Sequence, residues 1–270
     1  MKIRRLSWAG FEIEAADGTL AVIDLLEDST PLEEHLGPPA EPLMPCTRPG
    51  EAAIAILTHL HRDHADAAAI ARALRPGARL VRPPAMTGPR LATIGTTAAE
   101  HELGQHDLPT EVVETGGQTT EGPFTLTALQ AVDGSGDTQH SWLIEADGQR
   151  VVHAGDTMWH GWWWSRAMTY GPVDAALLPA NGPLLDFPHR QPPSGIPGVM
   201  PPEHAVAAAA AMQARVLVPM HYGLFDLPPA YRPVPDPEAK LTAEAERRGV
   251  PLRIMRPGDE LDLATVEQAA

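Results

Sequence analysis

Four side chains of types that commonly bind metal ions lie within six residues of one another, namely His59, His61, Asp63 and His64. The apolar segment 52–58 that precedes them is typical of a buried strand, and 65–75 after them predicts a helix ended by Pro76 and Gly77. In a regular helix or strand, side chains at this spacing point in different directions. A turn at the end of a strand can bring them together at two neighbouring points, so the segment predicts a metal site there.

The whole chain, residues 1–270, is predicted to form one α/β domain, because strands, single helices and hairpins alternate without a repeat or a linker. Two hairpins are expected at 1–26 and 141–155, where Asp-Gly pairs supply the turns. The other expected elements are strands at 77–84, 111–114, 123–132, 174–180 and 215–220, helices at 203–214 and 237–248, and proline-rich loops at 27–50 and 182–202.

Composition excludes several classes of protein. The formal net charge of −15 gives a surface that repels phosphate backbones, so nucleic acid is not an expected partner. Cys46 is the only cysteine, which excludes an internal disulfide and a cysteine-rich structural zinc site. Charges interrupt the N-terminal segment early, and no apolar run has the length of a membrane span, so we expect a cytoplasmic protein.

The HxHxDH pattern of residues 59–64 resembles the signature of the metallo-β-lactamase superfamily, and two later motifs resemble that family in the same order. These are HAGDT at 153–157 and VPMHYG at 218–223. The opening segment resembles the first hairpin of the branch that includes the L-ascorbate-6-phosphate lactonases. The resemblance covers about residues 3–225, which leaves 226–270 as a C-terminal extension, and it implies an αββα four-layer sandwich.

The resemblance also implies the metal ligands. His59 and His61 would bind one metal, Asp63 and His64 a second, Asp156 would bridge the two, and His221 would be the last histidine ligand. Asp63 and Asp156 are the expected catalytic residues, with Asp63 also orienting the nucleophile.

One position departs from the family pattern. Where the family supplies a further histidine, this chain has Asp133, which we interpret as a carboxylate ligand. The alternative is a turn residue before Gly134 that leaves the first metal with fewer ligands. His140 is the other nearby histidine, and we expect it to cap a strand or face solvent.

Charge counting gives this position a chemical consequence. Two divalent ions bring four positive charges, and Asp63, Asp156 and a bridging hydroxide remove three. A further carboxylate at Asp133 makes the site neutral, which favours harder ions. We expect two divalent metal ions and take zinc as the first choice. The neutral site is the reason that manganese and iron are kept as alternatives.

Residues for substrate binding are less well defined. Four of the six tryptophans lie between residues 159 and 164, where they could line an apolar pocket or pack a helix onto the core. The candidates are His160 and Trp162 in this segment, Asn181 at a strand end, and His189 beside Arg190 in the second proline-rich loop.

The expected function is hydrolysis of a small-molecule ester, lactone, amide or phosphoester by a metal-bound hydroxide. Two alternatives stay open: a di-iron redox protein, and a non-catalytic metal-binding or sensing protein of the same fold. The sequence also leaves open a homo-oligomer. No spacing in the chain selects the substrate, because one fold and its metals serve many reactions.

Overall fold

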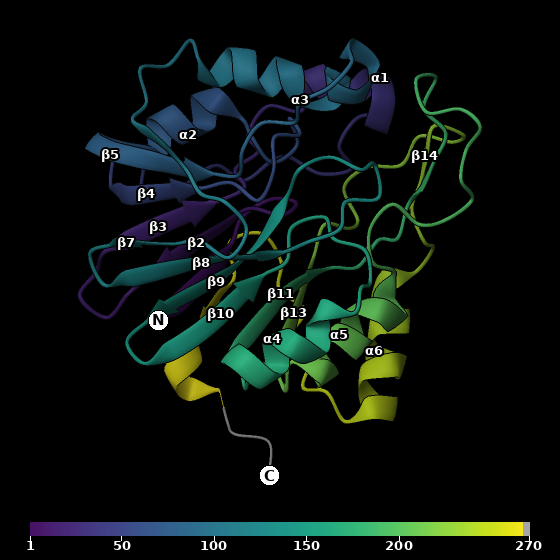
Figure 1. Cartoon of the computed structure of the whole chain (residues 1–270). Helices are drawn as coiled ribbons and strands as arrows, with labels where there is room; N and C mark the ends of the chain where they lie inside the picture. Colours follow the sequence, from purple (N-terminus) through teal and green to yellow (C-terminus); the bar gives the residue numbers. More distant parts are fainter. Residues whose placement is uncertain (267–270) are drawn as a thin grey trace.

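Two β-sheets form the centre of the computed structural model, which describes residues 1–266 (Figure 1). The first sheet has the strand order β15 (Glu260–Asp262), β1 (Lys2–Arg5), β2 (Phe11–Glu14), β3 (Leu20–Ile23), β4 (Ala52–Ile56), β5 (Leu74–Arg82) and β6 (Thr110–Val112). The second has the order β13 (Val216–Met220), β11 (Ala175–Pro179), β10 (Gln149–His153), β9 (His140–Ala146), β8 (Phe124–Gln130) and β7 (Gln118–Glu121). A two-stranded sheet joins β12 (Leu184–Leu185) to β14 (Tyr231–Arg232).

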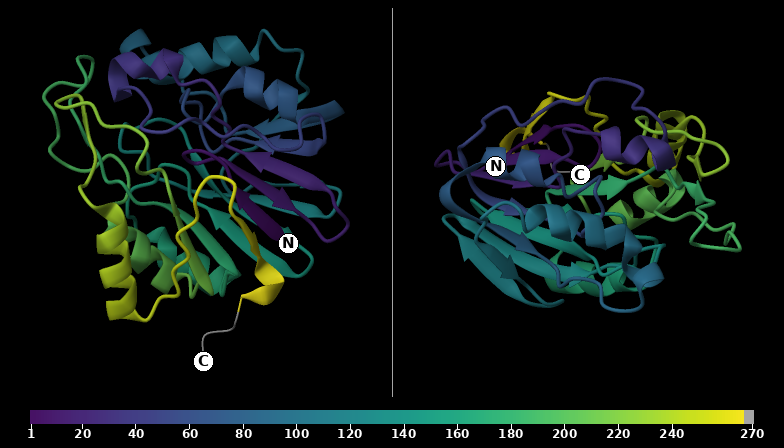
Figure 2. Two further views of the ribbon diagram at one scale, coloured as in Figure 1. Left: turned by 180° about the vertical axis from the view of Figure 1, so that it is seen from behind. Right: turned by 90° about the horizontal axis from the view of Figure 1, so that it is seen from above.

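Helices cover the outer face of each sheet. On the first sheet lie α2 (Ala67–Ala73) and α3 (Arg90–Leu103), and on the second lie α4 (Trp162–Tyr170), α5 (Pro202–Ala211) and α6 (Pro237–Arg248). Figure 2 shows the same layers from behind and from above. The short elements are η1 (Thr30–Leu32), α1 (Glu33–Leu36) and η2 (Leu263–Thr265). The predicted αββα sandwich is confirmed.

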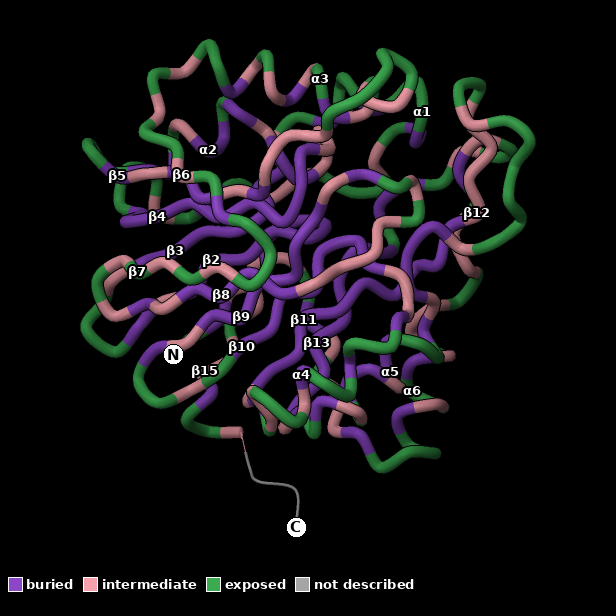
Figure 3. Tube along the Cα trace, in the orientation of Figure 1, coloured by how far each residue is buried: buried purple, intermediate pink, exposed green. Residues whose placement is uncertain are grey.

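The alternation of side chains along each strand explains the layers. In β4, Ile54 and Ile56 face the second sheet while Ala55 packs under α2 and α3. In β9, Trp142 faces the first sheet, whereas Leu143 packs under the helices of the other side. Because successive side chains of a strand point to opposite faces, both faces of each sheet bury apolar groups. The buried trace therefore follows the strands, and exposed residues collect on helices and loops (Figure 3).

The segment after residue 226 packs into both halves of the molecule. β15 pairs antiparallel with β1, with Leu261 opposite Ile3. In α6, Leu241 and Ala245 are buried in the cluster that also contains residues of α5. Residues 226–266 thus add an edge strand to one sheet and a covering helix to the other.

The structure differs from the sequence-based expectations in several places, and the short strands β7, β12, β14 and β15 were not expected. The helix α3 was not predicted, because β-branched residues and Gly95 weaken its helical pattern and its Leu91 is 66% exposed. The loop 27–50 contains the short helices η1 and α1. The helix after His64 ends at Ala73 and the chain enters β5 at once, before Pro76 and Gly77. Within residues 1–266, no helix is both long and apolar enough to cross a membrane.

Candidate metal centre

A turn between β4 and α2 carries the four clustered side chains. The backbone N–H groups of His64 and Ala65 both donate to the carbonyl of His61, at 3.0 and 2.9 Å, which closes the turn. The Asp66 carboxylate then accepts from the N–H of Ala69 and caps the helix. The chain therefore leaves a buried strand and starts a helix within a few residues, and the turn projects four ligand-type side chains.

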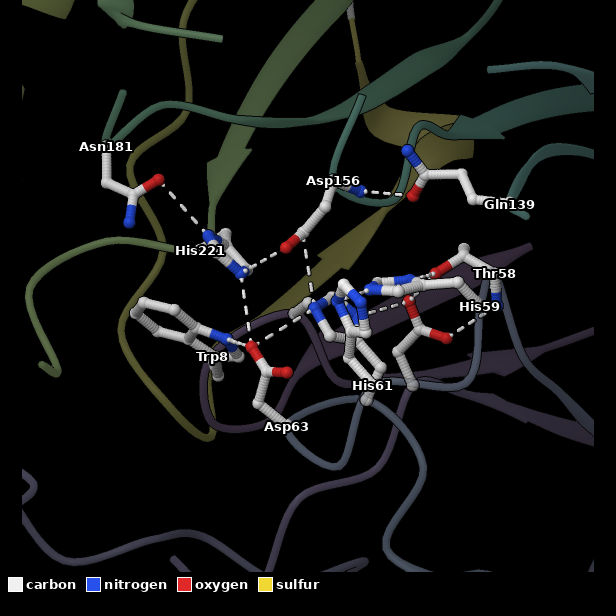
Figure 4. A network of polar contacts seen from close by, with 12 residues as sticks. Trp8, Thr58, His59, His61, Asp63, Gln139, Asp156, Asn181 and His221 are labelled. Atoms are coloured by element: carbon white, nitrogen blue, oxygen red, sulfur yellow. Dashed lines mark hydrogen bonds and ion pairs between the residues drawn. The ribbon is translucent and has the colours of Figure 1, made fainter. Parts of the chain in front are cut away.

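The seven residues predicted as ligands lie in two groups. In each group, the atoms that the side chains offer lie within 4.8 Å of one another. The first group contains His59, His61 and Asp133, and the second contains Asp63, His64, Asp156 and His221. Figure 4 shows five of them, His59, His61, Asp63, Asp156 and His221, on loops at the ends of strands.

Asp156 lies at the centre of the second group. Its two carboxylate oxygens lie 3.2 Å from Nε2 of His64 and 2.9 Å from Nε2 of His221. Oδ2 of Asp63 lies 3.5 Å from each of the same two nitrogens. All four groups are largely buried, so their lone pairs converge on a space that water barely reaches.

The opposite nitrogen of each histidine in the second group is held by a neighbour. Nδ1 of His64 lies 2.8 Å from Oδ2 of Asp24, and Nδ1 of His221 lies 3.1 Å from Oδ1 of Asn181. Both partners can accept the proton on Nδ1, so Nε2, which faces Asp156, is the nitrogen available to a metal ion. Such an arrangement is typical of histidines that bind a metal ion.

In the first group, Thr58 sets the tautomer of His59. The Thr58 hydroxyl donates to Asp24 at 2.6 Å, so it accepts from Nδ1 of His59 at 2.9 Å. Nε2 of His59 then faces Nδ1 of His61 at 2.9 Å. Nε2 of His61 lies 2.8 Å from Oδ2 of Asp137, whose side chain is 1% exposed.

Asp133 makes the contact of a turn residue and also lies where a ligand would lie. Its Oδ1 accepts from the N–H of Ser135 at 2.6 Å, which is a turn contact, and its carboxylate also lies beside His59 and His61. Burial, together with the charges of Asp156 and Asp137, raises the pKa of Asp133 to about 6, although His61 opposes the shift.

The charges fit a cation. Burial alone raises the pKa of Asp156, but His221 and His64 outweigh it and hold that pKa well below its usual range. Burial opposes a proton on His64, yet the carboxylates of Asp156, Asp63 and Asp24 raise its pKa well above the usual value. Nε2 of His64 and of His221 have no well-oriented hydrogen-bond partner among residues 1–266. A cation bound between the two buried carboxylates would neutralise their charge. The donor set of imidazole and carboxylate groups suits zinc, manganese or iron.

Of the four predicted substrate-binding residues, only Asn181 touches a ligand group. Its amide is engaged at both ends, because Oδ1 contacts His221 and Nδ2 donates to the Tyr231 hydroxyl at 2.5 Å. Asn181 therefore orients His221, and its amide nitrogen faces Tyr231.

The other three lie apart from the ligand groups. His160 is buried and stacks on Trp163, with ring centroids 4.8 Å apart. Trp162 is 45% exposed on α4. His189 is exposed on the proline-rich loop, where it stacks on Phe187. The expectation that His140 caps a strand or faces solvent is wrong in its second part, since it begins β9 but is buried with Nε2 2.8 Å from the Val113 carbonyl.

Three residues at the centre were not found from the sequence. Trp8 donates from Nε1 to Oδ2 of Asp63 at 2.9 Å. Gln139 accepts from the N–H of Asp156 at 2.9 Å, and Asp137 holds His61. Trp8 lies in the opening segment that resembles the family, but nothing there indicated its contact with Asp63, and Asp137 and Gln139 follow Asp133 closely in the same loop.

Two sheets packed face to face, with paired histidine and carboxylate groups at their strand ends, define a metallo-β-lactamase type of protein. The chain belongs to the family described as the beta-lactamase superfamily domain, whose model matches residues 21–222.

A relative from Thermococcus kodakarensis, named a UPF0173 metal-dependent hydrolase, is 31% identical over 79% of this chain and 83% of its own length. Among solved structures, the metallo hydrolase Igni18 from Ignicoccus hospitalis has a TM-score of 0.64 at 23% identity and covers 96% of this chain and 97% of that chain. CmlA, a diiron β-hydroxylase from Streptomyces venezuelae, has a TM-score of 0.73 at 15% identity, over 96% of this chain and 53% of that chain.

Proposed function

We propose that the chain is a metal-dependent hydrolase with a dinuclear centre that cleaves a small-molecule ester, lactone, amide or phosphoester. The observation that carries the proposal is the division of seven ligand-type residues into two adjacent groups, with Asp156 contacting two histidines. The related proteins named metal-dependent hydrolases support it.

Each of the two groups would bind one metal ion. His59, His61 and Asp133 would hold one ion, and Asp63, His64, Asp156 and His221 would hold the other. Bound divalent ions of this kind lower the pKa of water and polarise the bond to be cleaved.

The chain itself supplies orientation and shielding. Trp8 holds Asp63 through its indole N–H and lies 3.9 Å, centroid to centroid, from the ring of His221. Gln139 holds the backbone of Asp156. These contacts fix two carboxylates and an imidazole before any substrate arrives, and such preorganisation is a main source of catalysis in metal sites.

The first group is the more open one. The side chain of His61 is 20% exposed, whereas that of His64 is fully buried and that of His221 is 3% exposed. A substrate would therefore reach the centre from the side of His61.

A second candidate function is di-iron redox chemistry. The observation that favours it is the carboxylate at Asp133 in a histidine-rich group, since extra oxygen ligands suit iron. The likeness of fold to a diiron hydroxylase keeps this candidate in the test below.

The test uses metal-free protein reloaded separately with zinc, manganese or iron and assayed on a panel of esters, lactones, amides and phosphodiesters. We expect metal-dependent turnover that chelation abolishes and that His64→Ala lowers by about 100-fold. His101→Ala is the control, because His101 is an exposed helix residue. Oxygen consumption by the iron form without hydrolysis would support the redox candidate, and no turnover with any metal would support a binding role.

A further inference from the structure

The proline-rich segment 183–200 lies against the loop that carries Asp133 and Asp137. The N–H of Met200 donates to the carbonyl of Thr157, the residue after Asp156, at 3.1 Å. The backbone of Gly198 packs so closely on Gly134 that a Cβ added to Gly134 would lie 2.2 Å from the Gly198 carbonyl oxygen. The base of the segment is therefore anchored beside both ligand groups.

The tip of the segment, residues 189–196, is more exposed than its base. Residues 191–196 and His189 are exposed, and Arg190 between them is the residue whose side chain reaches inward. Its Nη2 lies 2.9 Å from Oδ2 of Asp137, and its Nη1 donates to the carbonyl of Ser135. One guanidinium thus joins the tip to two points of the 133–137 loop.

Oδ2 of Asp137 is shared. The same oxygen lies 2.9 Å from Arg190 and 2.8 Å from Nε2 of His61, and the Asp137 side chain is 1% exposed. Because a single buried atom receives both contacts, the position of Arg190 and the direction of the His61 ring depend on each other. His61 in turn places Nδ1 2.9 Å from His59, inside the first ligand group.

Helix α3 is a second close neighbour of the same pair. A Cβ added to Gly95 would lie 3.4 Å from the ring of His61 and 3.6 Å from Oδ2 of Asp137. Asp137 is therefore approached both by α3 and by Arg190 of the proline-rich segment.

We propose that Arg190 is a positioning residue that couples the proline-rich segment to the first ligand group: it holds Asp137, which holds His61 in its metal-binding orientation. Docking of the segment on the 133–137 loop and binding of a divalent cation by His59, His61 and Asp133 then favour each other. Such coupling is reciprocal by thermodynamic necessity. The inference rests on the metal centre of the proposed function and not on the bond that is cleaved.

A double-mutant cycle tests the path through Asp137. Zinc is titrated into the metal-free full chain against a chromophoric chelator, for the parent, Arg190→Gln, Asp137→Asn and the double variant. We expect Asp137→Asn to weaken one of two zinc equivalents by about 10- to 100-fold, and Arg190→Gln to weaken the same equivalent by about 3- to 10-fold. In the double variant, loss of Arg190 should add nothing to the effect of Asp137→Asn.

Three controls keep the result specific. Gln191→Ala is the matched variant, because the Gln191 amide contacts Asp186 and Phe187 within the segment and not the ligand groups. It should bind zinc as the parent does. Arg190→Lys should recover part of the affinity, since an ammonium can still donate to Asp137. Thermal unfolding of each variant checks that it folds.

A second readout follows the segment itself. Hydrogen exchange of the backbone amides in 187–198 should slow on zinc addition in the parent and in Gln191→Ala, but not in Arg190→Gln. Zinc binding by Arg190→Gln equal to that of the parent, additive losses in the double variant, or exchange that zinc leaves unchanged in the parent would each overturn the inference. Failure of the parent to bind zinc, manganese or iron would instead overturn the metal centre, and with it the proposed function.

Discussion

The ring of His64 is held by the buried carboxylate of Asp24, with Nδ1 and Oδ2 2.8 Å apart. Asp24 also accepts from the N–H and the hydroxyl of Thr58, at 2.8 and 2.6 Å. A single carboxylate at the end of β3 therefore orients His64 directly and His59 through Thr58, so it supports one ligand of each group.

Asp24→Asn should accordingly weaken metal binding at both groups. An amide can keep some of the contacts but loses the charge that strengthens them, and we expect about a 10- to 100-fold loss of zinc affinity. Competition titration against a chelator measures it. The control is Asp107→Asn, an exposed carboxylate outside the centre. Affinities equal to the parent in both variants would show that Asp24 does not support the metal centre.

Gly155→Ala should destabilise the fold. Gly155 has a φ of +64°, and a Cβ there would lie 2.8 Å from Cβ of Thr58 and 2.9 Å from Oε1 of Gln139. Strain and overpacking together should lower the free energy of unfolding by about 2 kcal/mol or more. Denaturant unfolding measures the loss.

Gly148→Ala is the matched comparison for that substitution. Gly148 also has a positive φ, +71°, but an added Cβ would have nothing within 4 Å. Its substitution should lower the free energy of unfolding by only about 1 kcal/mol, which is the cost of a left-handed backbone conformation for alanine. Equal losses at the two positions would contradict the role given to the contact between Gly155 and Thr58.

The thiol of Cys46 should be inert in the folded protein. Burial, with a smaller contribution from Glu12 and Glu27, raises its pKa to about 12, and the residue is 7% exposed. Only the thiolate reacts readily, and at pH 8 the folded protein holds almost none. A chromogenic disulfide reagent should therefore label one thiol in denaturant and none in buffer within the same time. Rapid labelling of the native protein would be the contrary result.

Arg166→Met should stabilise the protein. The guanidinium is 2% exposed, none of its nitrogens has a hydrogen-bond partner among residues 1–266, and burial lowers its pKa to about 9. The group lies 4.5 Å from the centroid of the Trp163 ring, but a cation–π contact returns only about 2 kcal/mol. An unpaired buried charge costs more than that.

Because the pKa of Arg166 is lowered in the folded state, its penalty is present at neutral pH and is relieved only as the pH rises above about 9. The substitution should therefore raise the unfolding temperature at pH 7. Arg247→Met, at an exposed helix position paired with Glu244, should change it little. A lower unfolding temperature for Arg166→Met would show that the guanidinium has a partner or a structural role.

The strand before His59 and the cluster at residues 59–64 could be predicted from local patterns, whereas the four-layer fold and the ligand roles of Asp156 and His221 followed from the family resemblance. Composition indicates both the strand before His59 and the turn after it, and β4, at Ala52–Ile56, lies within the expected 52–58. The helix α3 gave no such pattern, since Ile94 and Leu91 on it are exposed rather than arranged in a buried stripe.

Trp8 and Asp137, which contact the ligand residues Asp63 and His61, could not be predicted from the sequence. Trp8 contacts Asp63 across 55 positions of the chain, and Asp137 contacts His61 across 76. Such contacts follow from how the two sheets pack, and a single sequence carries no signal of them. Asn181 shows the same limit, because only the structure reveals that its amide is occupied by His221 and Tyr231.

The most direct test of the account is the metal content of protein purified without added metal, measured beside the Asp133→Ala variant. Two equivalents in the parent, falling toward one in the variant, is the result that two ligand groups with Asp133 in the first of them predict. One equivalent or fewer in both proteins would contradict the dinuclear centre and leave only the group around Asp156 as a metal site.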